Sequence, residues 1–462
     1  MSHYFAHLEI EQLLKDYPIG HEFVQAYGRM SRDELRSKQE ERFLRVMARA
    51  WDIPFYRRRW QGVGLEPGDI RGLNDITKLP VYDKADIMES IEAYPPFGDF
   101  TGWSRDPRSA VFPVTFHTTS GTTGKPQILL FGPKGREVGN LLAARMYQWQ
   151  GLTSGDVVHS VYGHGTINGG HYIREAVTHF TSALFVPAGT GAETRSARQV
   201  ELMRDFGATV LVGFVDYLRK LSNTAHELGI IPGEDIEIRM ISGHLGMEDR
   251  SLVEDDWGGA KVYDWYGVAD TGSIAGEGPD RDGLYIWEDA HFLELLDIED
   301  GRPVAPGEKG DMVCTCLYKD DIFPVIRFNT HDVSAAKLGS NATGMVFERI
   351  EGFLGRSDNM VKLRGINVFP HAVGQILADE QAFNGAFVCF IDRDQTGRDE
   401  MTVMVEIKDQ ASGSFHADLS EKLKLGLGVS VLVEHVPEGA TAVFTEIDRR
   451  QKPLRLIDRR GR

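Results

Sequence analysis

The clearest periodic pattern in the first part of the chain is helical. Apolar residues recur at helical spacing from Leu35 to Ala50, with polar residues between them. Ser31 stands just before this pattern and Glu34 follows three residues later, which is the spacing of a capping box. The sequence therefore predicts a helix over residues 31–51 with Ser31 as its N-cap.

Between residues 110 and 270 the pattern changes to short apolar runs separated by polar segments of helical character. The runs are rich in β-branched residues, and their alternation with helices predicts a mainly parallel sheet with helices on its faces. Ligands of such sheets bind beside the carboxyl ends of the strands. The expected strands are QILLF, VVHSVYG, SALFVPAG, ATVLVGF, IRMISG and VYDWYG.

Strand-like runs without long helices follow between residues 283 and 350, and they predict an antiparallel extension. These runs are LYIWED, FLELLDI, DMVCTCLY, PVIRF and GMVFERI. Residues 352–370 are rich in glycine and charge, which is typical of a domain boundary. Beyond them a helix, two strands, a second helix and a strand predict a small α+β domain. We therefore expect an α/β protein with one domain over residues 1–354 and another over 355–462.

The composition narrows the class of protein. The 462 residues include 51 Lys plus Arg against 68 Asp plus Glu, so the formal net charge is −17. Nucleic acids and anionic membrane surfaces are bound by basic faces, so this balance argues against both as partners. The N-terminus lacks the pattern of a secretory signal, and no run of about 18 apolar residues is present. We therefore expect a cytoplasmic protein.

Three cysteines, Cys314, Cys316 and Cys389, are too few for a disulfide framework. Cys314 and Cys316 have no second Cys/His pair at zinc-site spacing, which argues against a structural zinc site. Side chains alternate between the two faces of a β-strand, so Cys314 and Cys316, two residues apart, would lie on the same face. The sequence therefore predicts two small core residues.

The densest chemical signal is the segment His117–Pro126, directly before the expected strand QILLF. Its glycines let the backbone approach a ligand closely, and its hydroxyls and amides can donate to phosphate oxygens. It is not a Walker loop, because Thr119 and Pro126 stand where that motif needs glycine and Ser or Thr. The segment favours a polyphosphate-binding loop over a surface turn.

Four other segments are ambiguous when each is taken alone. Tyr263–Asp270 offers aromatics for a purine and a carboxylate for Mg²⁺, but it also fits a core strand followed by a solvated acid. Arg327–Asp332 places an acid just past a strand, where it could bind sugar hydroxyls or be solvated. Gly355–Gly365 also fits a basic hairpin, and the tail Arg449–Arg462, with seven bases, also fits a solvated end.

Taken together, these segments resemble the adenylate-forming acyl-CoA ligase superfamily and, within it, the phenylacetate–CoA ligase branch. The likeness covers nearly the whole chain, in the same order and spacing. The segments that carry it are PFYRRRWQGVGLEPGDI, LPVYDKADI, TTSGTTGKP, GLYIWED, RFNTHD and GRSDNMVKLRGINVFP. The resemblance implies a large N-terminal adenylate-forming domain with mixed sheets and helices, and a small mobile C-terminal α+β domain.

The resemblance also implies an ATP-binding set. Tyr266 would stack on adenine, Asp332 would bind the ribose hydroxyls, and Arg356 would assist at ribose or phosphate. The glycine-rich loop would cradle the β- and γ-phosphates, and two residues after Tyr266 would pack near the α-phosphate. The loop residues are Thr119, Ser120, Gly121, Thr122, Thr123, Gly124 and Lys125, and the two that follow Tyr266 are Gly267 and Val268.

Catalytic, hinge and CoA roles follow from the same resemblance. Lys452 matches the catalytic lysine, although Gln451 replaces the usual glycine before it. Asp270 stands where the family usually has a glutamate that organises Mg²⁺; its shorter side chain would hold the ion through water. Asp358 would be the hinge of the small domain. Arg364 and Gly365 would contact CoA, with Gly365 beside the pantetheine tunnel.

The implied reaction is an AMP-forming ligation. ATP and a carboxylic acid would give acyl-AMP and pyrophosphate, and CoA would then give acyl-CoA and AMP. Two alternatives stay open, an adenylation protein that loads a carrier protein and a decayed nucleotide-binding regulator. Asp270 and Asn359, which departs from a commonly acidic position, are the only support for the regulator. Homodimer formation is left open.

The resemblance also implies an acid pocket at Tyr162, His164, Phe214 and Gly243. Close relatives that take aryl acids tend to be apolar and glycine-rich in the first of these segments, whereas this chain adds polar groups at His164, Asn168 and His171. Polar groups suit a hydroxyl-bearing acid, unless the histidines are satisfied structural residues. Two acids therefore remain open, a small aromatic or arylacetic acid and a short branched hydroxy acid.

Overall fold

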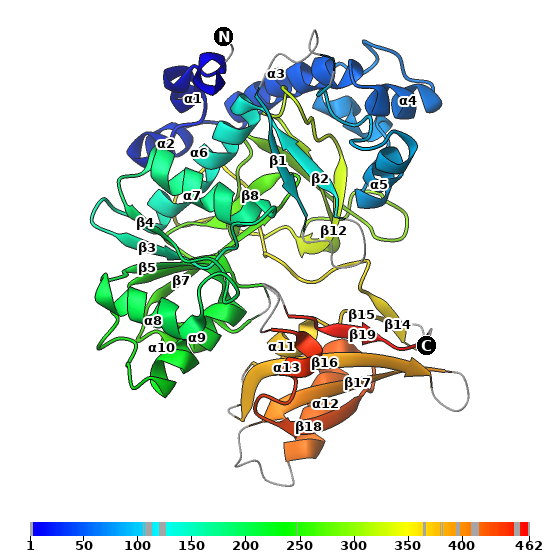
Figure 1. Ribbon diagram of the computed structural model, residues 1–462. Helices are drawn as coiled ribbons and strands as arrows, with labels where there is room; N and C mark the ends of the chain where they lie inside the picture. Colours follow the sequence, from blue (N-terminus) through cyan, green and yellow to red (C-terminus); the bar gives the residue numbers. More distant parts are fainter. Residues whose placement is uncertain are drawn as a thin grey trace. The chain divides into compact units, whose positions relative to one another are not determined.

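The computed structural model describes most of the chain (Figure 1). The residues outside the description are 1–2, 105, 107–112, 120–125, 247, 364–365, 379, 381, 394–397, 408–414, 448–452 and 461–462, and side chains are also left out at 362, 367, 375 and 415–418. The chain forms two compact units, Met1–Pro187 with Tyr263–Gly352, and Ala188–Val262 with Phe353–Arg462. The predicted domain division after residue 354 stays a prediction.

The first unit begins with a series of helices. The predicted helix over residues 31–51 is confirmed as α3 (Arg32–Trp51), with a complete capping box at its start. Ser31 Oγ accepts from the Glu34 amide at 3.2 Å, and Glu34 Oε2 accepts from the Ser31 amide at 2.8 Å. The other helices here are η1 (Tyr4–His7), α1 (Ile10–Asp16), α2 (Gly20–Tyr27), α4 (Pro54–Gly62), η2 (Leu73–Lys78) and α5 (Lys84–Ala93).

A hairpin and a parallel pair of strands continue this unit. The strands β1 (Thr115–Thr118) and β2 (Ile128–Phe131) are antiparallel. They lead into α6 (Pro133–Gln150), a helix buried along most of its length. The strands β3 (Val157–Ser160) and β4 (Leu184–Pro187) are parallel and joined by α7 (Asn168–Phe180), as the strand–helix alternation predicts.

The rest of the first unit is antiparallel. The strand β7 (Lys261–Val268) pairs with β8 (Gly272–Glu277), which pairs with β9 (Leu284–Ile286), and β13 (Arg349–Ile350) adds to β9. A separate three-stranded sheet consists of β10 (His291–Leu296), β11 (Lys309–Cys316) and β12 (Phe328–Ala335). The predicted antiparallel extension is confirmed.

Two predictions about β12 are wrong. The run PVIRF is not a strand, and Asp332 lies inside β12 rather than past the end of a strand. The reason is a backbone turn at Arg327, whose φ is 55° and whose guanidinium pairs with Glu294 at 2.9 Å. A second positive φ, 57° at His331, bends β12 itself, which is typical of a bulge.

The second unit contains two groups of elements. The first comprises α8 (Ser196–Asp205), β5 (Val210–Phe214), α9 (Val215–Glu227), β6 (Met240–His244) and α10 (Arg250–Asp256). The strands β5 and β6 are parallel, as predicted. The second group comprises β14 (Val361–Leu363), β15 (Ile366–Val368), α11 (Ala372–Ile376), β16 (Phe383–Arg393), β17 (Asp399–Ile407), α12 (Phe415–Leu427), β18 (Leu432–Pro437), α13 (Ala442–Thr445) and β19 (Leu456–Asp458).

The C-terminal elements form a four-stranded sheet in the order β18-β17-β16-β19. The predicted helix, two strands, helix and strand are present as α11, β16, β17, α12 and β18. The basic tail is not simply a solvated end, because β19 pairs in parallel with β16. Charge dominates the composition of this segment, and the apolar Leu456 and Ile457 are too short a run to predict a strand alone. No helix of the described residues is long and apolar enough to cross a membrane.

A buried ion pair lies at the centre of the first unit. Arg145 of α6 and Asp289, between β9 and β10, are both fully buried and form two hydrogen bonds of 2.9 Å. Tyr27 of α2 donates to Asp289 Oδ2 at 2.7 Å, and Arg42 of α3 donates to the Asp289 carbonyl. Burial alone would raise the pKa of Asp289, but the Arg145 charge and its hydrogen bonds keep it below its usual value.

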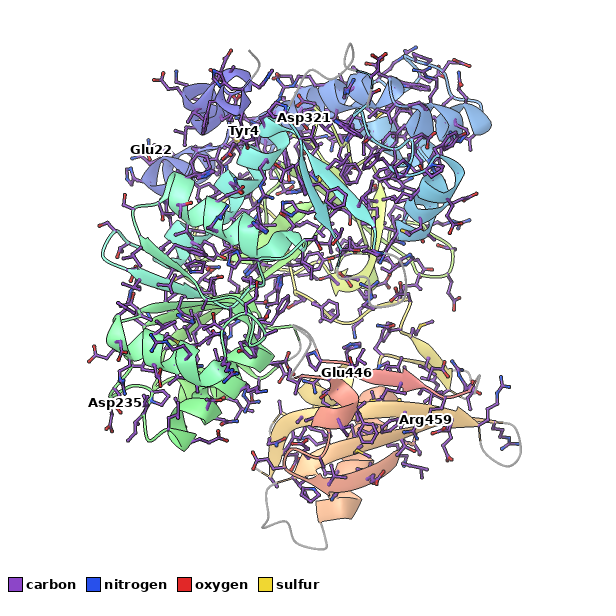
Figure 2. The ribbon with its side chains drawn as sticks, viewed as in Figure 1. Tyr4, Glu22, Asp235, Asp321, Glu446 and Arg459 are labelled. Carbon is purple, nitrogen blue, oxygen red and sulfur yellow. The ribbon has the colours of Figure 1, made fainter. Side chains whose placement is uncertain are left out.

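Side chains also connect the N-terminus to α6. Tyr4, labelled in Figure 2, donates its hydroxyl to Glu137 Oε1 at 2.7 Å. Asp321, also labelled there, accepts from the Gly135 amide at 2.9 Å in the first turn of α6, where orphan amides favour a carboxylate. Both contacts are made in the first part of α6, at Gly135 and Glu137.

We predict that Asp289→Ala lowers the free energy of unfolding by about 3–5 kcal/mol, because Arg145 is left as an unpaired buried charge. Urea unfolding followed by circular dichroism measures this. The control is Glu41→Ala, which removes an exposed partner of Arg45 and is expected to cost less than about 1 kcal/mol. Equal losses in the two variants would contradict the central role of Asp289.

Candidate active site

The structure brings together two residues that the sequence places far apart, Tyr266 and Asp332. Tyr266 lies near the end of β7 and Asp332 in the middle of β12. The Tyr266 hydroxyl donates to Asp332 Oδ2 at 2.8 Å and approaches Thr330 Oγ1 at 3.1 Å. Both side chains are buried. The pair predicted to contact adenine and ribose is therefore one hydrogen-bonded unit, to which Thr330 adds a partner that the sequence did not indicate.

A tight turn follows Tyr266 and carries Asp270. A Cβ atom on Gly267 would lie 2.3 Å from the Gly272 carbonyl oxygen, so only glycine fits there. Val268 ends β7, and its carbonyl accepts from the Thr271 amide at 3.1 Å. Gly272 then starts β8 with a φ of 72°, which a residue with a side chain rarely adopts. The turn fixes the position of Asp270 between two antiparallel strands.

Asp270 is buried, not solvated, with 4% of its surface exposed. Its Oδ1 accepts from Gln127 Nε2 at 2.5 Å, and its carbonyl accepts from Lys319 Nζ. The Lys319 ammonium lies 5.0 Å from the ring centre of Phe131 and 5.1 Å from that of Phe323, so cation–π contacts stabilise it. Burial raises the pKa of Asp270 although Gln127 and Lys319 oppose the rise, and burial lowers the pKa of Lys319.

The residues around Asp270 fit a magnesium ion. Gln127 Oε1 is buried and has no hydrogen-bond partner among the described residues. Carboxylate and amide oxygens are the hard ligands that Mg²⁺ takes, usually together with water and substrate phosphates. A cation there would also relieve the cost of burying the Asp270 charge. Around Asp270, the sequence did not indicate Gln127 or Lys319, and the only signal was the position of Gln127 shortly after the loop segment.

The base of the predicted phosphate loop is closed by hydrogen bonds. The Thr119 amide donates to the Gln127 carbonyl at 3.0 Å, and the Gln127 amide donates to Thr119 Oγ1 at 3.2 Å. Thr119 is thus placed next to the residue that binds Asp270. The remaining loop residues, Ser120 through Lys125, lie outside the described residues, as do Arg364, Gly365 and Lys452.

Two predicted acid-pocket residues, Tyr162 and His164, follow β3 in the first unit. Tyr162 is buried, and His164 is partly buried with its ring 5.6 Å from that of His171. His171 Nε2 donates to the carbonyls of His164 at 2.7 Å and of Gly165 at 2.9 Å. Asn168 Oδ1 accepts from Arg136. His171 and Asn168 therefore hold the loop in place.

A further histidine lies beside this loop. The ring of His117 is 5.1 Å from that of His171, and burial lowers the pKa of His117 to about 4. His117 is consequently neutral at physiological pH. The imidazoles of His117, His164 and His171 thus form a polar cluster next to β1 and β3.

The other two predicted acid-pocket residues, Phe214 and Gly243, belong to the second unit. Phe214 ends β5 and stacks on His244 of β6, with ring centres 4.9 Å apart and planes 20° apart. A Cβ atom on Gly243 would lie 2.0 Å from the Gly213 carbonyl oxygen, so close strand approach requires glycine there. These residues present a flat aromatic pair at the carboxyl ends of two parallel strands.

Arg356 and Asp358 also belong to the second unit and form an ion pair with each other. The Arg356 Nη2 to Asp358 Oδ2 distance is 2.6 Å, and the Asp358 side chain is exposed. The predicted ATP contact and the predicted hinge are therefore coupled by charge. A rotation of the backbone at Asp358 would either break this ion pair or move Arg356 together with Asp358.

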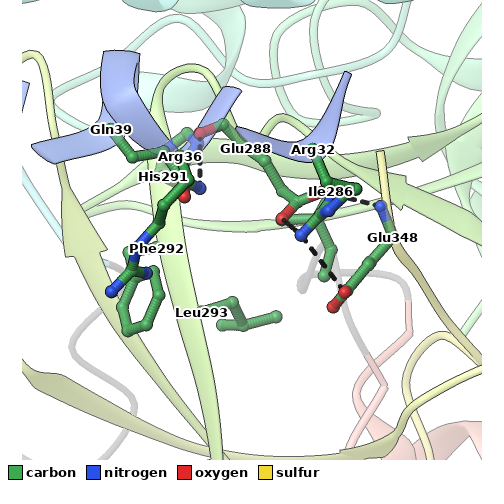
Figure 3. Close-up of a pocket in the computed structure, with 9 residues that line it drawn as sticks. All are labelled: Arg32, Arg36, Gln39, Ile286, Glu288, His291, Phe292, Leu293 and Glu348. Atoms are coloured by element: carbon green, nitrogen blue, oxygen red, sulfur yellow. Dashed lines mark hydrogen bonds and ion pairs between the residues drawn. The ribbon is translucent and has the colours of Figure 1, made fainter. Parts of the chain in front are cut away.

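One pocket of the first unit, about 260 Å³ in volume, lies between α3 and the strands that follow Ile286 (Figure 3). Its charges are already paired, since Arg32 contacts Glu288 at 2.6 Å and Glu348 at 3.2 Å. Of the predicted ATP-binding and acid-binding residues that the structure describes, none lines this pocket. It is distinct from the predicted active-site residues.

Comparisons with known proteins decide the family. Residues 365–460 match the AMP-binding enzyme C-terminal domain. The phenylacetate–coenzyme A ligase of Aromatoleum evansii is 30% identical over 446 residues, which cover 93% of this chain and 96% of that protein. The chain belongs to the phenylacetate–CoA ligase family. The same ligase of Thermus thermophilus is 30% identical over 441 residues, covering 89% of this chain and 94% of that protein.

Solved structures agree with this assignment. A 2-hydroxyisobutyryl-CoA ligase in its postadenylation state, in complex with 2-HIB-AMP, is 27% identical with a TM-score of 0.81, over 94% of this chain and 91% of that one. An open form of that ligase with 2-HIB-AMP and CoA has a TM-score of 0.68 at 26% identity, over 93% and 92% of the two chains. The predicted fold class, an α/β protein with a C-terminal α+β region, is confirmed.

As a member of the phenylacetate–CoA ligase family, this protein is an AMP-forming acyl-CoA synthetase. It uses ATP and CoA with a small carboxylic acid, and Mg²⁺ is typical of the family. The family favours CoA over a carrier protein as thiol acceptor, and an active enzyme over a decayed regulator. The predicted activity is therefore confirmed at the level of the reaction.

In this phenylacetate–CoA ligase family member, an ion-paired histidine stabilises the strand that carries Asp332. The carboxylates of Asp311 and Asp83 raise the pKa of the half-buried His331 to about 10. His331 Nε2 lies 2.8 Å from Asp83 Oδ2, and Nδ1 lies 3.6 Å from Asp311 Oδ2. His331 is therefore protonated at neutral pH and links β12 to the start of α5.

We predict that this link stabilises the fold fully below the unfolded-state pKa of about 6.5. The contribution falls as the pH rises from there towards a folded-state pKa of about 10, because the folded protein then binds more protons than the unfolded chain. Urea unfolding at pH values across this window measures the effect. The variant His331→Gln should show a flatter pH dependence in that window; an unchanged dependence would contradict the assignment.

Proposed function

We propose that the acid activated by this enzyme is a short branched hydroxy acid. The observation that carries the proposal is the imidazole cluster of His117, His164 and His171, which places hydrogen-bonding groups in the segment that follows β3. A buried polar group gains most from a substrate that can bond to it. The likeness to a ligase solved with 2-HIB-AMP supports the same class of acid. His164 is the residue that we expect to recognise the acid.

A small aromatic or arylacetic acid is the second candidate. The stacked pair of Phe214 and His244 offers a flat face for an aromatic ring. The curated relatives are also phenylacetate–coenzyme A ligases. The two acids differ in the role they give His164. A hydroxy acid offers a hydroxyl to which the imidazole can hydrogen-bond, whereas a phenyl ring does not.

For ATP we propose the roles that the sequence resemblance implies. Tyr266 positions adenine, Asp332 accepts from the ribose hydroxyls, and the loop from Thr119 to Lys125 binds the phosphates. The hydrogen bond between Tyr266 and Asp332 supports joint recognition of base and sugar. Asp270 and Gln127 would hold Mg²⁺, which neutralises phosphate charge when bound. Gly267 and Val268 bring a backbone stretch close to the α-phosphate.

In the first chemical step the acid carboxylate must approach the α-phosphate of ATP. Both groups are anions that repel each other, so a positive charge is needed between them. We propose that Lys452 contacts the acid carboxylate and the α-phosphate as acyl-AMP and pyrophosphate form. Arg356 would assist at ribose or phosphate, and Asp358 would be the hinge. A rotation there would replace Lys452 by the CoA-binding face that includes Arg364 and Gly365, so that the CoA thiolate attacks the acyl carbonyl and AMP leaves.

Further proposals concern the organisation of the protein and its setting. We propose a C-terminal domain over residues 355–462, which the match over residues 365–460 supports. The formal charge of −17 supports a protein without nucleic-acid or membrane partners. We propose a cytoplasmic enzyme on the basis of its nucleotide and CoA substrates, and a homodimer is left open.

We predict that Lys452→Ala lowers the rate of acid-dependent pyrophosphate release by a factor on the order of 100 or more, because one positioned cation is lost from the transition state. Thioester formation from supplied acyl-AMP should be nearly unchanged. The matched control is Lys424→Ala, an exposed lysine of α12 paired with Glu421, which should affect neither step. Equal losses in both half-reactions would exclude Lys452 as the adenylation lysine.

We predict that short branched hydroxy acids give higher kcat/KM than arylacetic acids in an assay of AMP release with ATP, Mg²⁺ and CoA. His164→Ala should lower kcat/KM for the hydroxy acids by about tenfold or more and leave the KM for ATP nearly unchanged. The exposed His226 provides the control His226→Ala. If the wild-type enzyme prefers arylacetic acids and His164→Ala does not change the acid profile, the hydroxy-acid proposal is wrong.

A further inference from the structure

A group of soft side chains lies in the three-stranded sheet, on residues that are not assigned to ATP or acid. His291 starts β10, and Cys314 and Cys316 end β11. In the antiparallel register His291 is directly opposite Cys316, and Cys314 is two residues along the same strand. Residues two apart on a strand share a face, so the three side chains converge. All three residues are fully buried.

The distances within this cluster suit a shared ligand. One ring nitrogen of His291 and the two sulfur atoms all lie within 4.8 Å of one another. The His291 Nδ1 atom is buried and has no hydrogen-bond partner among the described residues. A buried imidazole nitrogen without a partner costs free energy unless something binds it. The cluster therefore contains an unsatisfied donor or acceptor next to two thiols.

Both cysteines are buried free thiols. Thiols bind metal ions as thiolates, so a bound cation would favour the deprotonated form of both side chains and release protons.

We propose that His291, Cys314 and Cys316 bind a thiophilic divalent cation, for which zinc is the best fit. Two thiolates and one imidazole are ligands that select zinc over Mg²⁺, which prefers oxygen. Zinc bonds of about 2.0–2.3 Å bring ligand atoms closer than they are here by about 1 Å, a change that side-chain rotation can supply. The Thr271 carbonyl oxygen, 3.3 Å from His291 Nε2, would accept from the imidazole while Nδ1 faces the ion, and a water would complete the site.

The position of the cluster gives the ion a structural role. Thr271 directly follows Asp270, and its carbonyl also accepts from the Tyr318 hydroxyl at 2.7 Å. A cation bound beside this carbonyl would tie the sheet of β10, β11 and β12 to the turn that carries Asp270. His291 also lines the pocket of Figure 3, so the cluster lies next to a cavity rather than within continuous packing.

The competing account is a dry core in which two cysteines act as small apolar residues and His291 is merely buried. The spacing of Cys314 and Cys316 along the chain favoured that account, because no second Cys/His pair follows them. The third ligand instead comes from the neighbouring strand through its register. The two accounts differ in one measurable property, the binding of one metal ion per chain.

The test is the metal content of the full-length protein after incubation with Zn²⁺ and removal of free ions, measured by mass spectrometry. Zinc should bind at one ion per chain, and Co²⁺ in its place should give a thiolate-to-metal charge-transfer band. Cys316→Ala and His291→Gln should lower the affinity at least about tenfold. The third buried cysteine supplies the control, Cys389→Ala, which should bind as the wild type does.

Several outcomes would overturn the proposal. These are no bound zinc and no charge-transfer band in the wild-type protein, equal binding by the Cys316→Ala and Cys389→Ala variants, or a Cys314–Cys316 disulfide in place of free thiols. If Cys316→Ala fails to fold, as judged by circular dichroism, Cys314→Ser and His291→Gln measure the same loss. Because the readout is bound metal, failure of this proposal is independent of the acid and ATP assignments.

Discussion

The ion pair of Arg145 and Asp289 is the interaction on which the first unit depends. Both charges are completely buried, and Arg145 also donates to the Pro18 carbonyl at 2.8 Å while Arg42 donates to the carbonyl of Asp289. An unpaired charge at this depth would cost several kcal/mol. The elements that carry Arg145 and Asp289 must therefore both be in place for either charge to be buried. The N-terminal helices, α6 and the start of β10 are thereby fixed relative to one another.

That constraint reaches the candidate active site through the strands. Asp289 lies two residues before β10, and β10 pairs through β11 with β12, which carries Asp332. Asp332 in turn accepts from Tyr266 on β7, and the turn after β7 carries Asp270. Tyr266, Asp270 and Asp332 are thus linked to Asp289 through antiparallel strands and one side-chain hydrogen bond. Lys319 and His331 add positive charge to it, which the net charge of −17 did not reveal.

Much of this organisation could be predicted from the sequence. The capping box at Ser31 is local, since the hydrogen bonds join residues three apart. The strand–helix alternation and the glycine-rich loop are also local patterns, and several such segments in register carried the family resemblance. The errors have a physical reason too. The run PVIRF has strand composition, but the turn at Arg327 is set by its contact with Glu294 from another strand.

The sequence by itself determined the secondary-structure pattern, the family and the chemical types needed for ATP, because these depend on residues near one another in the chain. Only the tertiary structure decided which distant side chains meet. Gln127 reaches Asp270 across the unit, and His171 and Asn168 proved to hold their own loop. His291 lies opposite Cys316 only because β10 and β11 pair in one register. Strand register and burial are properties of the packed whole, and no local pattern specifies them.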